Sequence, residues 1–370
     1  MNTKLNIIKA IMLILFSGLL FYKTVGMINK SSGIFPDGYS YINNGDGKIL
    51  FSEISETQKS ELYPENILIN AVSFSSGYAQ SVGGILAYAD IIFTDKNYVD
   101  FHDINIIKGS LFSDSADNIS AVISENLANR LFKTTDIIGG KFYLSDKEIT
   151  VAGVYKPDKI FLSEIASDGK EYIIISYSFD FLHNKADYLY AKAQTADGHF
   201  SALDEIKLNS LLDGKLNNYY KINLSENKRI ISQFKDMLFF LTGVIINIFL
   251  AKKILKYCAL LMNGENKRTA IYIKISAGVI ILIIIAFISS FELHIPPDFF
   301  PDDKNILNLR HYASLYKYFI QAQNTSGYYF YNNLYFWSII LVIPLIILNL
   351  TAVAITVFAV NKYLKKLVLY

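Results

Sequence analysis

The sequence contains a single cysteine, Cys258, among 370 residues. One cysteine cannot form an intrachain disulfide or build a metal site from several thiolates. Charged residues are also scarce, at 18% of the chain, and the formal net charge is only +2. Because no dense stripe of Lys and Arg runs along any segment, the sequence does not favour a nucleic-acid-binding protein.

Motifs of common catalytic sites are missing as well. A phosphate-binding loop needs G-x-x-x-x-G-K-[ST], but the run Gly45-Asp-Gly-Lys48 lacks the first glycine and the following Ser or Thr, so it predicts a turn. None of the five histidines belongs to a metal-binding pattern, and each is interpreted as a solvated or a core residue. The sequence therefore predicts no enzyme, no cofactor and no metal site. The histidines are His102, His183, His199, His294 and His311.

Apolar residues are abundant, at 52% of the chain, and the mean hydropathy is +0.29. Four apolar runs cover residues 7–27, 237–251, 275–291 and 334–360. A membrane-spanning helix needs about 20 such residues. We expect four spans, the second extending towards residue 261 and the fourth containing Pro344. The first run could instead be a secretory signal peptide, but no A-x-A-like cleavage site follows it, which favours an uncleaved anchor.

Basic residues set the expected orientation, because cytoplasmic segments of membrane proteins are rich in Lys and Arg. The N-terminus, the loop 252–274 and the C-terminal tail are all basic, whereas the loop 292–333 mixes both signs. We therefore expect a multi-pass plasma-membrane protein with both termini in the cytoplasm. The aromatic stretch SGYYFYNNLYFW before the fourth span suits the membrane interface. The abundance of Asn, Ile, Lys and Tyr is typical of an AT-rich bacterial genome.

Residues 30–235 contain no run long enough to span a membrane. Phe142 and Leu144 alternate with polar residues, and after a turn a second strand follows over residues 149–154. Residues 122–132, VISENLANRLF, predict a strand followed by a helix that Ser124 caps. The expected fold class is an α+β extracytoplasmic domain inserted between one N-terminal and three C-terminal transmembrane helices. The expected domains are 1–29 with the first span, 30–235 outside, and a three-helix region over 236–370.

Residues 93–156 resemble the extracytoplasmic core domain of MacB-like ABC transporter permeases, which carry FtsX-like permease spans. The matching positions keep the family's order and spacing. They are Tyr98, Phe101, Ile106, Gly109 and Phe112, then residues 122–132, 138–141 and 151–154. The resemblance implies a permease subunit without catalytic activity, which passes ATP-driven motion from a separate ATPase to the outer domain. The substrate would be a peptide, a lipid or an envelope component.

The resemblance also implies that the loop 252–274 is the element that a partner ATPase grips, and this loop could form an amphipathic coupling helix. The candidate coupling residues are Glu265, Asn266, Lys267 and Arg268. Alternatively, the basic residues of this loop only fix the topology against anionic lipid.

A helical stalk is expected over residues 226–236, between the outer domain and the second span. Expected partners are the separate ABC ATPase, a second copy or a second permease, membrane lipid, and an extracytoplasmic partner. The alternative function is a non-transporting scaffold or regulator whose outer domain binds a cell-envelope partner.

Overall fold

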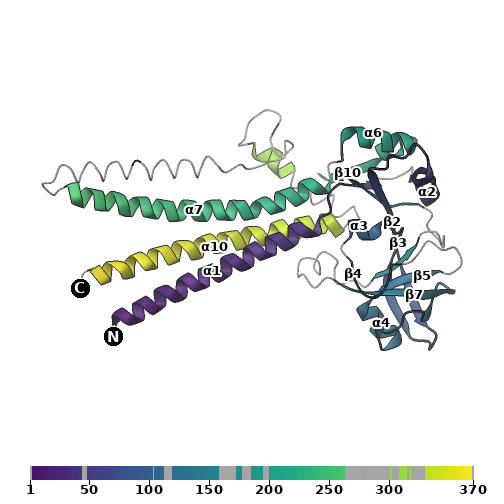
Figure 1. Ribbon diagram of the computed structural model, residues 1–370, viewed down its shortest axis with the longest axis horizontal. Helices are drawn as coiled ribbons and strands as arrows, with labels where there is room; N and C mark the ends of the chain where they lie inside the picture. The colour runs from purple at the N-terminus through teal and green to yellow at the C-terminus, as the bar shows by residue number, and fades with distance from the viewer. Residues whose placement is uncertain are drawn as a thin grey trace. The chain divides into compact units, whose positions relative to one another are not determined.

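A computed structural model describes residues 2–43, 48–102, 104–111, 119–157, 172–176, 185–194, 200–262, 278, 301, 308–314, 317 and 330–368. The chain forms two compact units. One is the outer domain, Gly33–Lys228 with Lys317–Tyr335. The other contains the long helices, Met1–Ser32 with Arg229–Tyr316 and Phe336–Tyr370. Figure 1 shows the elements of both units.

Three long helices carry the apolar runs: α1 (Asn2–Ile34), α7 (Leu224–Met262) and α10 (Phe330–Val368). Each contains a segment long and apolar enough to cross a membrane, over Ile8–Ile34, Leu224–Lys253 and Asn333–Lys362. These segments correspond to the first, second and fourth predicted spans. The third predicted span, 275–291, lies outside the described residues except for Gly278. The helix predicted over residues 226–236 is confirmed, because α7 is continuous from Leu224 onward.

The outer domain is a mixed α+β fold, as predicted. The ten strands of its described residues follow the order β10-β1-β9-β2-β3-β8-β5-β7-β4, and β6 pairs with both β2 and β7. The strands are β1 (Tyr39–Asn43), β2 (Ile67–Ser81), β3 (Leu86–Thr94), β4 (Asn105–Gly109), β5 (Ser120–Ser124), β6 (Lys141–Leu144), β7 (Lys147–Lys156), β8 (Tyr172–Ser176), β9 (Tyr188–Ala193) and β10 (Tyr219–Asn223). The short helices are α2 (Phe51–Lys59), α3 (Tyr98–Phe101), α4 (Glu125–Phe132), α6 (Ala202–Leu211) and the 3₁₀ helix η1 (Lys215–Asn218).

Strand β2 is long enough to belong to two lobes of this domain. Its first part, Ile67 to Val72, pairs with β9, and the next part, Ser73 to Gln80, pairs with β3. Helices α2 and α6 lie in the lobe with β10, and α4 lies in the lobe with β5 and β7 (Figure 1). The shared strand therefore makes the two lobes one continuous sheet.

Asp187 stabilises the point where β2 changes partner. One of its carboxylate oxygens accepts hydrogen bonds from Ser73 Oγ at 2.9 Å and from the Phe74 amide at 3.0 Å. The other accepts a bond of 2.6 Å from Lys48 Nζ. A backbone amide left without a strand partner is costly when it is removed from water. The Asp187 side chain supplies that partner to Phe74.

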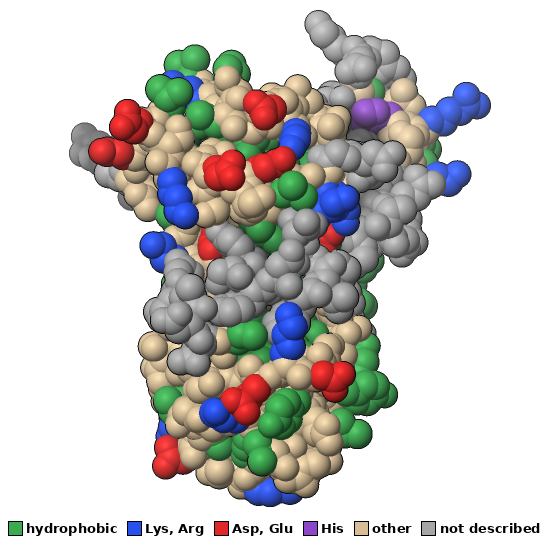
Figure 2. Space-filling model, turned by 90° about the vertical axis from the view of Figure 1, so that its right-hand side faces the viewer, with side chains coloured by type: hydrophobic (Ala, Val, Ile, Leu, Met, Phe, Trp, Pro, Cys, Tyr) green, Lys and Arg blue, Asp and Glu red, His purple; other side chains and the backbone are tan. Residues whose placement is uncertain are grey.

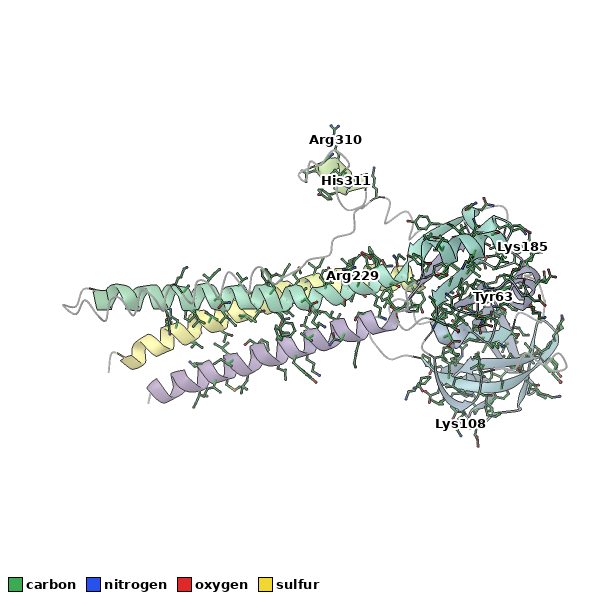
Figure 3. All side chains as sticks on the ribbon, turned by 45° about the horizontal axis from the view of Figure 1, so that its top comes forward. Tyr63, Lys108, Lys185, Arg229, Arg310 and His311 are labelled. Atoms are coloured by element: carbon green, nitrogen blue, oxygen red, sulfur yellow. The ribbon has the colours of Figure 1, made fainter. Side chains whose placement is uncertain are left out.

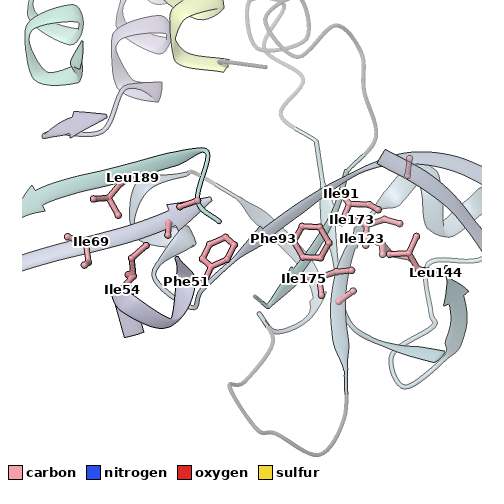
Figure 4. Close-up of a cluster of buried hydrophobic side chains, with 14 of the residues drawn as sticks. Phe51, Ile54, Ile69, Ile91, Phe93, Ile123, Leu144, Ile173, Ile175 and Leu189 are labelled. Atoms are coloured by element: carbon pink, nitrogen blue, oxygen red, sulfur yellow. The ribbon is translucent and has the colours of Figure 1, made fainter. Parts of the chain in front are cut away.

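Each lobe has its own buried apolar side chains. Ile54, Ile69 and Leu189 lie in one group, and Ile91, Ile123 and Ile173 lie in the other (Figure 4). Phe51 and Phe93 lie between these residues along β2 and its neighbours (Figure 4). Burying one such side chain contributes about 1.5–3 kcal/mol to folding. The core therefore follows the shared strand from one lobe into the next.

The predicted strand and helix over residues 122–132 are confirmed. Strand β5 ends at Ser124, whose Oγ accepts a hydrogen bond of 3.1 Å from the Leu127 amide and so caps α4. Leu127, Ala128 and Leu131 are buried on one face of that helix. The predicted hairpin is also present, because β6 and β7 pair across a turn in which Ser145 and Asp146 have φ of 48° and 67°.

Replacing the capping serine tests this local structure. Ser124→Ala removes the acceptor for the Leu127 amide, and we expect the free energy of unfolding of the outer domain to fall by about 1 kcal/mol. The measurement is a denaturant titration of the detergent-solubilised chain. Ser110→Ala, at an exposed serine, is the control and should change stability little. Equal effects of the two substitutions would contradict the capping role.

Candidate functional site

The predicted coupling residues Glu265, Asn266, Lys267 and Arg268 lie outside the described residues. Of the loop 252–274, residues 252–262 continue helix α7, and Lys253 Nζ lies 5.3 Å from the centroid of the Phe249 ring. Glu265 to Arg268 therefore stay predictions. The described residues bring together a different group, at the corner of the outer domain where α1 ends and α7 and α10 begin.

The first part of this corner joins the end of α1 to the start of α7. Residues 35–38 connect α1 to β1, and β10 runs directly into α7. Because β1 and β10 are antiparallel, Tyr39 pairs with Asn223, and the two helix ends meet. The Leu224 amide donates to Gly38 O at 3.0 Å, and the Gly38 amide donates to Ser225 Oγ at 2.7 Å. We call this group the backbone clasp.

Two further contacts support the backbone clasp. Asn223 Oδ1 accepts a hydrogen bond of 3.0 Å from the Glu226 amide, which satisfies one free donor at the start of α7. Lys228 Nζ lies 2.9 Å from Asp37 Oδ2. Both side chains of that ion pair are largely accessible to water, so the pair adds little stability and is weakened by salt. The hydrogen bonds to the backbone are therefore the stronger part of the clasp.

Gly38 cannot be replaced without disturbing the clasp. Its φ is +124°, a conformation that residues with a Cβ atom rarely adopt. A Cβ placed there would lie 2.3 Å from Ala191 O and 2.8 Å from Lys192 Cβ, both on β9. The chain therefore needs glycine at the point where it turns from α1 into the sheet and passes close to β9.

The second part of the corner holds the first turn of α10. Tyr331 is buried, and its hydroxyl donates a short hydrogen bond to Phe101 O. Its ring lies 5.8 Å from Phe35, in the segment after α1, and 5.9 Å from Tyr190 on β9. We call this group the aromatic cluster. Its members are Phe35, Tyr98, Phe101, His102, Tyr190 and Tyr331.

His102 is packed inside the aromatic cluster. Its ring stacks on Tyr98 at 4.0 Å, and its Nδ1 lies 3.1 Å from the Tyr331 hydroxyl. Because that hydroxyl already donates to Phe101 O, Nδ1 must carry the hydrogen and donate to Tyr331. Nε2 is then an acceptor, and it is buried without a hydrogen-bond partner among the described residues. Burial lowers the pKa of His102 to about 3, so the ring is neutral near pH 7.

The structure describes two of the five histidines, His102 and His311. His102 is a packed residue with a structural partner, which agrees with the core interpretation. His311 lies in the described segment 308–314, in which residues 309–314 are helical (Figure 3). The other three histidines lie outside the described residues. Among the described residues there is no group of three or more His, Cys, Asp and Glu side chains that could hold a metal ion.

The arrangement is suited to carrying mechanical displacement. Hydrogen bonds of 2.7 and 3.0 Å join the start of α7 to Gly38, the residue before β1. Ring contacts join the start of α10 to Phe35, after α1, and to Tyr190 on β9. On the face shown in Figure 2, basic and acidic side chains of the described residues are interspersed and form no patch of one sign. On this face the described residues therefore offer no patch of one charge to a nucleic acid or a highly charged ligand.

Sequence reasoning missed this corner. The sequence predicts the stretch SGYYFYNNLYFW at the membrane interface, which stays a prediction. It does not indicate that Tyr331 of this stretch is buried against Phe101 and His102. Gly38, directly after Pro36 and Asp37 and before a strand, was a local sign of a special turn. The partners of these residues come from distant parts of the chain, and no local pattern identifies them.

Comparison with known proteins gives one match to a family. Residues 18–207 match the model of the MacB-like periplasmic core domain. No curated protein matches the chain.

Solved structures similar to part of the chain include the periplasmic region of MacB from Actinobacillus actinomycetemcomitans. It is 18% identical, with a TM-score of 0.40, and the match covers 54% of this chain and 94% of that one. The extracellular domain of the noncanonic ABC-type transporter YknZ from Gram-positive bacteria is 15% identical, with a TM-score of 0.38 and coverage of 50% and 99%. A domain of a putative permease from Porphyromonas gingivalis is 16% identical, with a TM-score of 0.36 and coverage of 51% and 92%.

Adding a side chain at Gly38 tests the backbone clasp. We expect Gly38→Ala to lower the free energy of unfolding of the outer domain by about 3 kcal/mol, because it combines backbone strain with a clash against β9. The measurement is thermal or denaturant unfolding of the solubilised chain. Gly33→Ala is the matched control, since no atom lies within 4 Å of a Cβ added there. A similar, small effect of both substitutions would refute the requirement for glycine.

Acid should weaken the aromatic cluster. The pKa of His102 is about 3 in the folded chain and about 6.5 in an unfolded one, so only the unfolded chain gains this proton between those values. Stability from the neutral ring is therefore complete above pH 6.5 and declines as the pH falls towards 3. We expect His102→Asn, which keeps a donor near Tyr331 but does not titrate, to reduce this decline. Unfolding measured across that pH range checks it, and an identical slope in both proteins would contradict the assignment.

Proposed function

Because the chain belongs to the family of the MacB-like periplasmic core domain, we propose that it is the membrane permease subunit of an ABC transporter complex. In this proposal the chain carries no ATP-hydrolysing site, and a separate ABC ATPase supplies the energy. Its three candidate membrane helices and its outer domain make it a transporter-related membrane protein. The finer parts of the proposal concern coupling, topology and substrate.

The observation that carries the proposal is the corner of the outer domain. Hydrogen bonds at this corner hold three segments in place: the residues after α1, the start of α7 and the first turn of α10. A displacement of any one helix end would strain the hydrogen bonds at Gly38, just before β1, the hydrogen bond to Phe101 on α3, or the ring contact with Tyr190 on β9. Motion driven at the cytoplasmic ends of the spans would therefore reach the sheet of the outer domain and reshape its surface.

The coupling element of this proposal is the loop 252–274, with Glu265, Asn266, Lys267 and Arg268 as the residues that the ATPase grips. The proposed topology has four spans and cytoplasmic termini, and the outer domain lies outside the cell membrane. The chain would work as a homodimer or beside a second permease. Its outer domain would act on a peptide, a lipid or an envelope component.

A second candidate function is a non-transporting scaffold whose outer domain binds a cell-envelope partner. One observation favours it. Strands β2 and β3 expose a neighbouring pair of tyrosines, Tyr78 and Tyr88, at 64% and 51% of their surface, and their rings meet edge to face at 5.3 Å. Leu86 and Val82 are also exposed beside them. Exposed aromatic and aliphatic side chains that lie together on a sheet suit contacts with another protein.

Changing the coupling residues tests the proposal. We expect an ABC ATPase to be recovered with the chain from native membranes. The double substitution Glu265→Ala with Arg268→Ala should reduce that recovery strongly, because it removes two of the three charges that the coupling residues offer to the ATPase. Quantitative mass spectrometry of the recovered complex is the measurement. Lys59→Ala with Glu61→Ala, on the outer domain, is the control with equal charge loss. If no ATPase accompanies the unaltered chain, the scaffold function is supported instead.

A further inference from the structure

Among the described residues, the long helices make one polar contact between helices that is fully enclosed. Asn349 on α10 and Thr24 on α1 have 0% and 2% of their surface exposed. Asn349 Nδ2 donates to Thr24 Oγ1 at 2.7 Å and to the backbone Leu345 O of its own helix at 2.8 Å. Thr24 Oγ1 in turn donates to Leu20 O at 3.0 Å. Both hydrogens of the Asn349 amide therefore have acceptors while α1 and α10 are together.

These residues belong to a buried stripe along α10. Its buried positions in this unit are Ser338, Val342, Ile346, Asn349 and Thr356. Steps of three, four and seven residues keep them on one face of the helix, as in helices that pack over a long distance. Thr356 Oγ1 also lies 3.4 Å from Leu13 O on α1. The stripe thus contacts α1 at two levels.

Within a membrane, the hydrogen bond between Asn349 and Thr24 would oppose the separation of the two helices. Hydrocarbon offers no replacement partner for an amide hydrogen, so separating α1 from α10 would leave one hydrogen of Asn349 without an acceptor. Side-chain hydrogen bonds between membrane helices shift the association of two helices by about threefold on average. Polar residues inside spans are expensive and are generally functional.

In the part of the chain that the structure describes, helix α7 is less buried than α1 and α10. Among the described residues, 6% of the most apolar stretch of its candidate span is buried, compared with 17% for α1 and 22% for α10. Its ring contact with α1 is Phe21 against Phe239, edge to face at 4.8 Å. Phe239, Ile248 and Leu250 remain substantially exposed. Apolar contacts of this type exchange easily with lipid, because lipid tails are as apolar as the side chains.

We propose that Thr24 and Asn349 are positioning residues that hold α1 and α10 together as one unit within the membrane, and that α7 is the span that shifts against this pair. The role in motion rests on the proposed function, whereas the pairing of the two helices does not. Since α7 continues β10 without a break, its shift would act directly on the strand at the edge of the sheet.

Distances between spin labels test the proposal on the full chain in lipid nanodiscs, without ATPase or nucleotide. Cys258→Ser removes the native thiol. Cysteines replace the exposed residues Leu15 and Phe358 to report on α1 and α10, or Leu15 and Ile248 to report on α1 and α7. We expect a narrow distance distribution for the first pair of labels and a broader one for the second.

Substitutions at Thr24 and Thr351 distinguish the loss of the hydrogen bond between helices from nonspecific destabilisation. Thr24→Val removes the acceptor of the Asn349 amide and should increase the population with α1 and α10 apart by about threefold. Thr24→Ser keeps the hydroxyl and should restore the narrow distribution. Thr351→Val is the matched control, because the Thr351 hydroxyl bonds only Ile347 O of its own helix among the described residues.

Three results would overturn the proposal. They are an α1–α10 distribution as broad as that of α1–α7, no effect of Thr24→Val, or an equal effect of Thr351→Val. Asn349→Leu gives a second route to the same comparison if Thr24→Val inserts poorly. Because no ATPase is present, failure of the proposed transport function leaves these outcomes unchanged, and the two hypotheses are judged separately.

Discussion

The antiparallel pairing of β1 with β10 is the interaction on which the other features of the outer domain depend. β1 follows α1 through residues 35–38, and β10 leads straight into α7. Pairing Tyr39 with Asn223 brings together two helix ends, so Gly38 and Ser225 form a hydrogen bond although they are 187 residues apart along the chain. Backbone hydrogen bonds are short and directional, so a displaced helix end has to displace the strand beside it.

Strand β9 connects the two parts of the corner. Ala191 O is the atom that leaves no room for a side chain at Gly38, and Tyr190, one residue earlier, packs against Tyr331 at the start of α10. The backbone clasp and the aromatic cluster therefore share one strand. The same strand pairs with β2, whose long course joins the two lobes. A continuous set of backbone contacts thus runs from the helix ends to the far lobe, and this continuity is the physical basis of the proposed transmission.

Features that depend on local pattern were predicted well. The capped helix after Ser124 and the hairpin of β6 and β7 follow from capping and from alternation within a dozen residues. Three apolar runs became helices long enough to span a membrane for the same reason. The resemblance to MacB-like permeases was confirmed by the family match over residues 18–207. His102 could be interpreted only as solvated or core, because its partners Tyr98, Tyr190 and Tyr331 come from three separate segments.

By itself the sequence determined that this is a membrane protein with an inserted α+β domain, because hydropathy, helix capping and strand alternation act over short distances. Only the tertiary structure decided which helix ends meet, why Gly38 must lack a side chain, and that Asn349 bonds Thr24 across 325 residues of chain. Those contacts depend on sheet order and helix packing, which form between distant segments. For that reason the corner of the outer domain and the α1–α10 pair could be identified only from the folded structure.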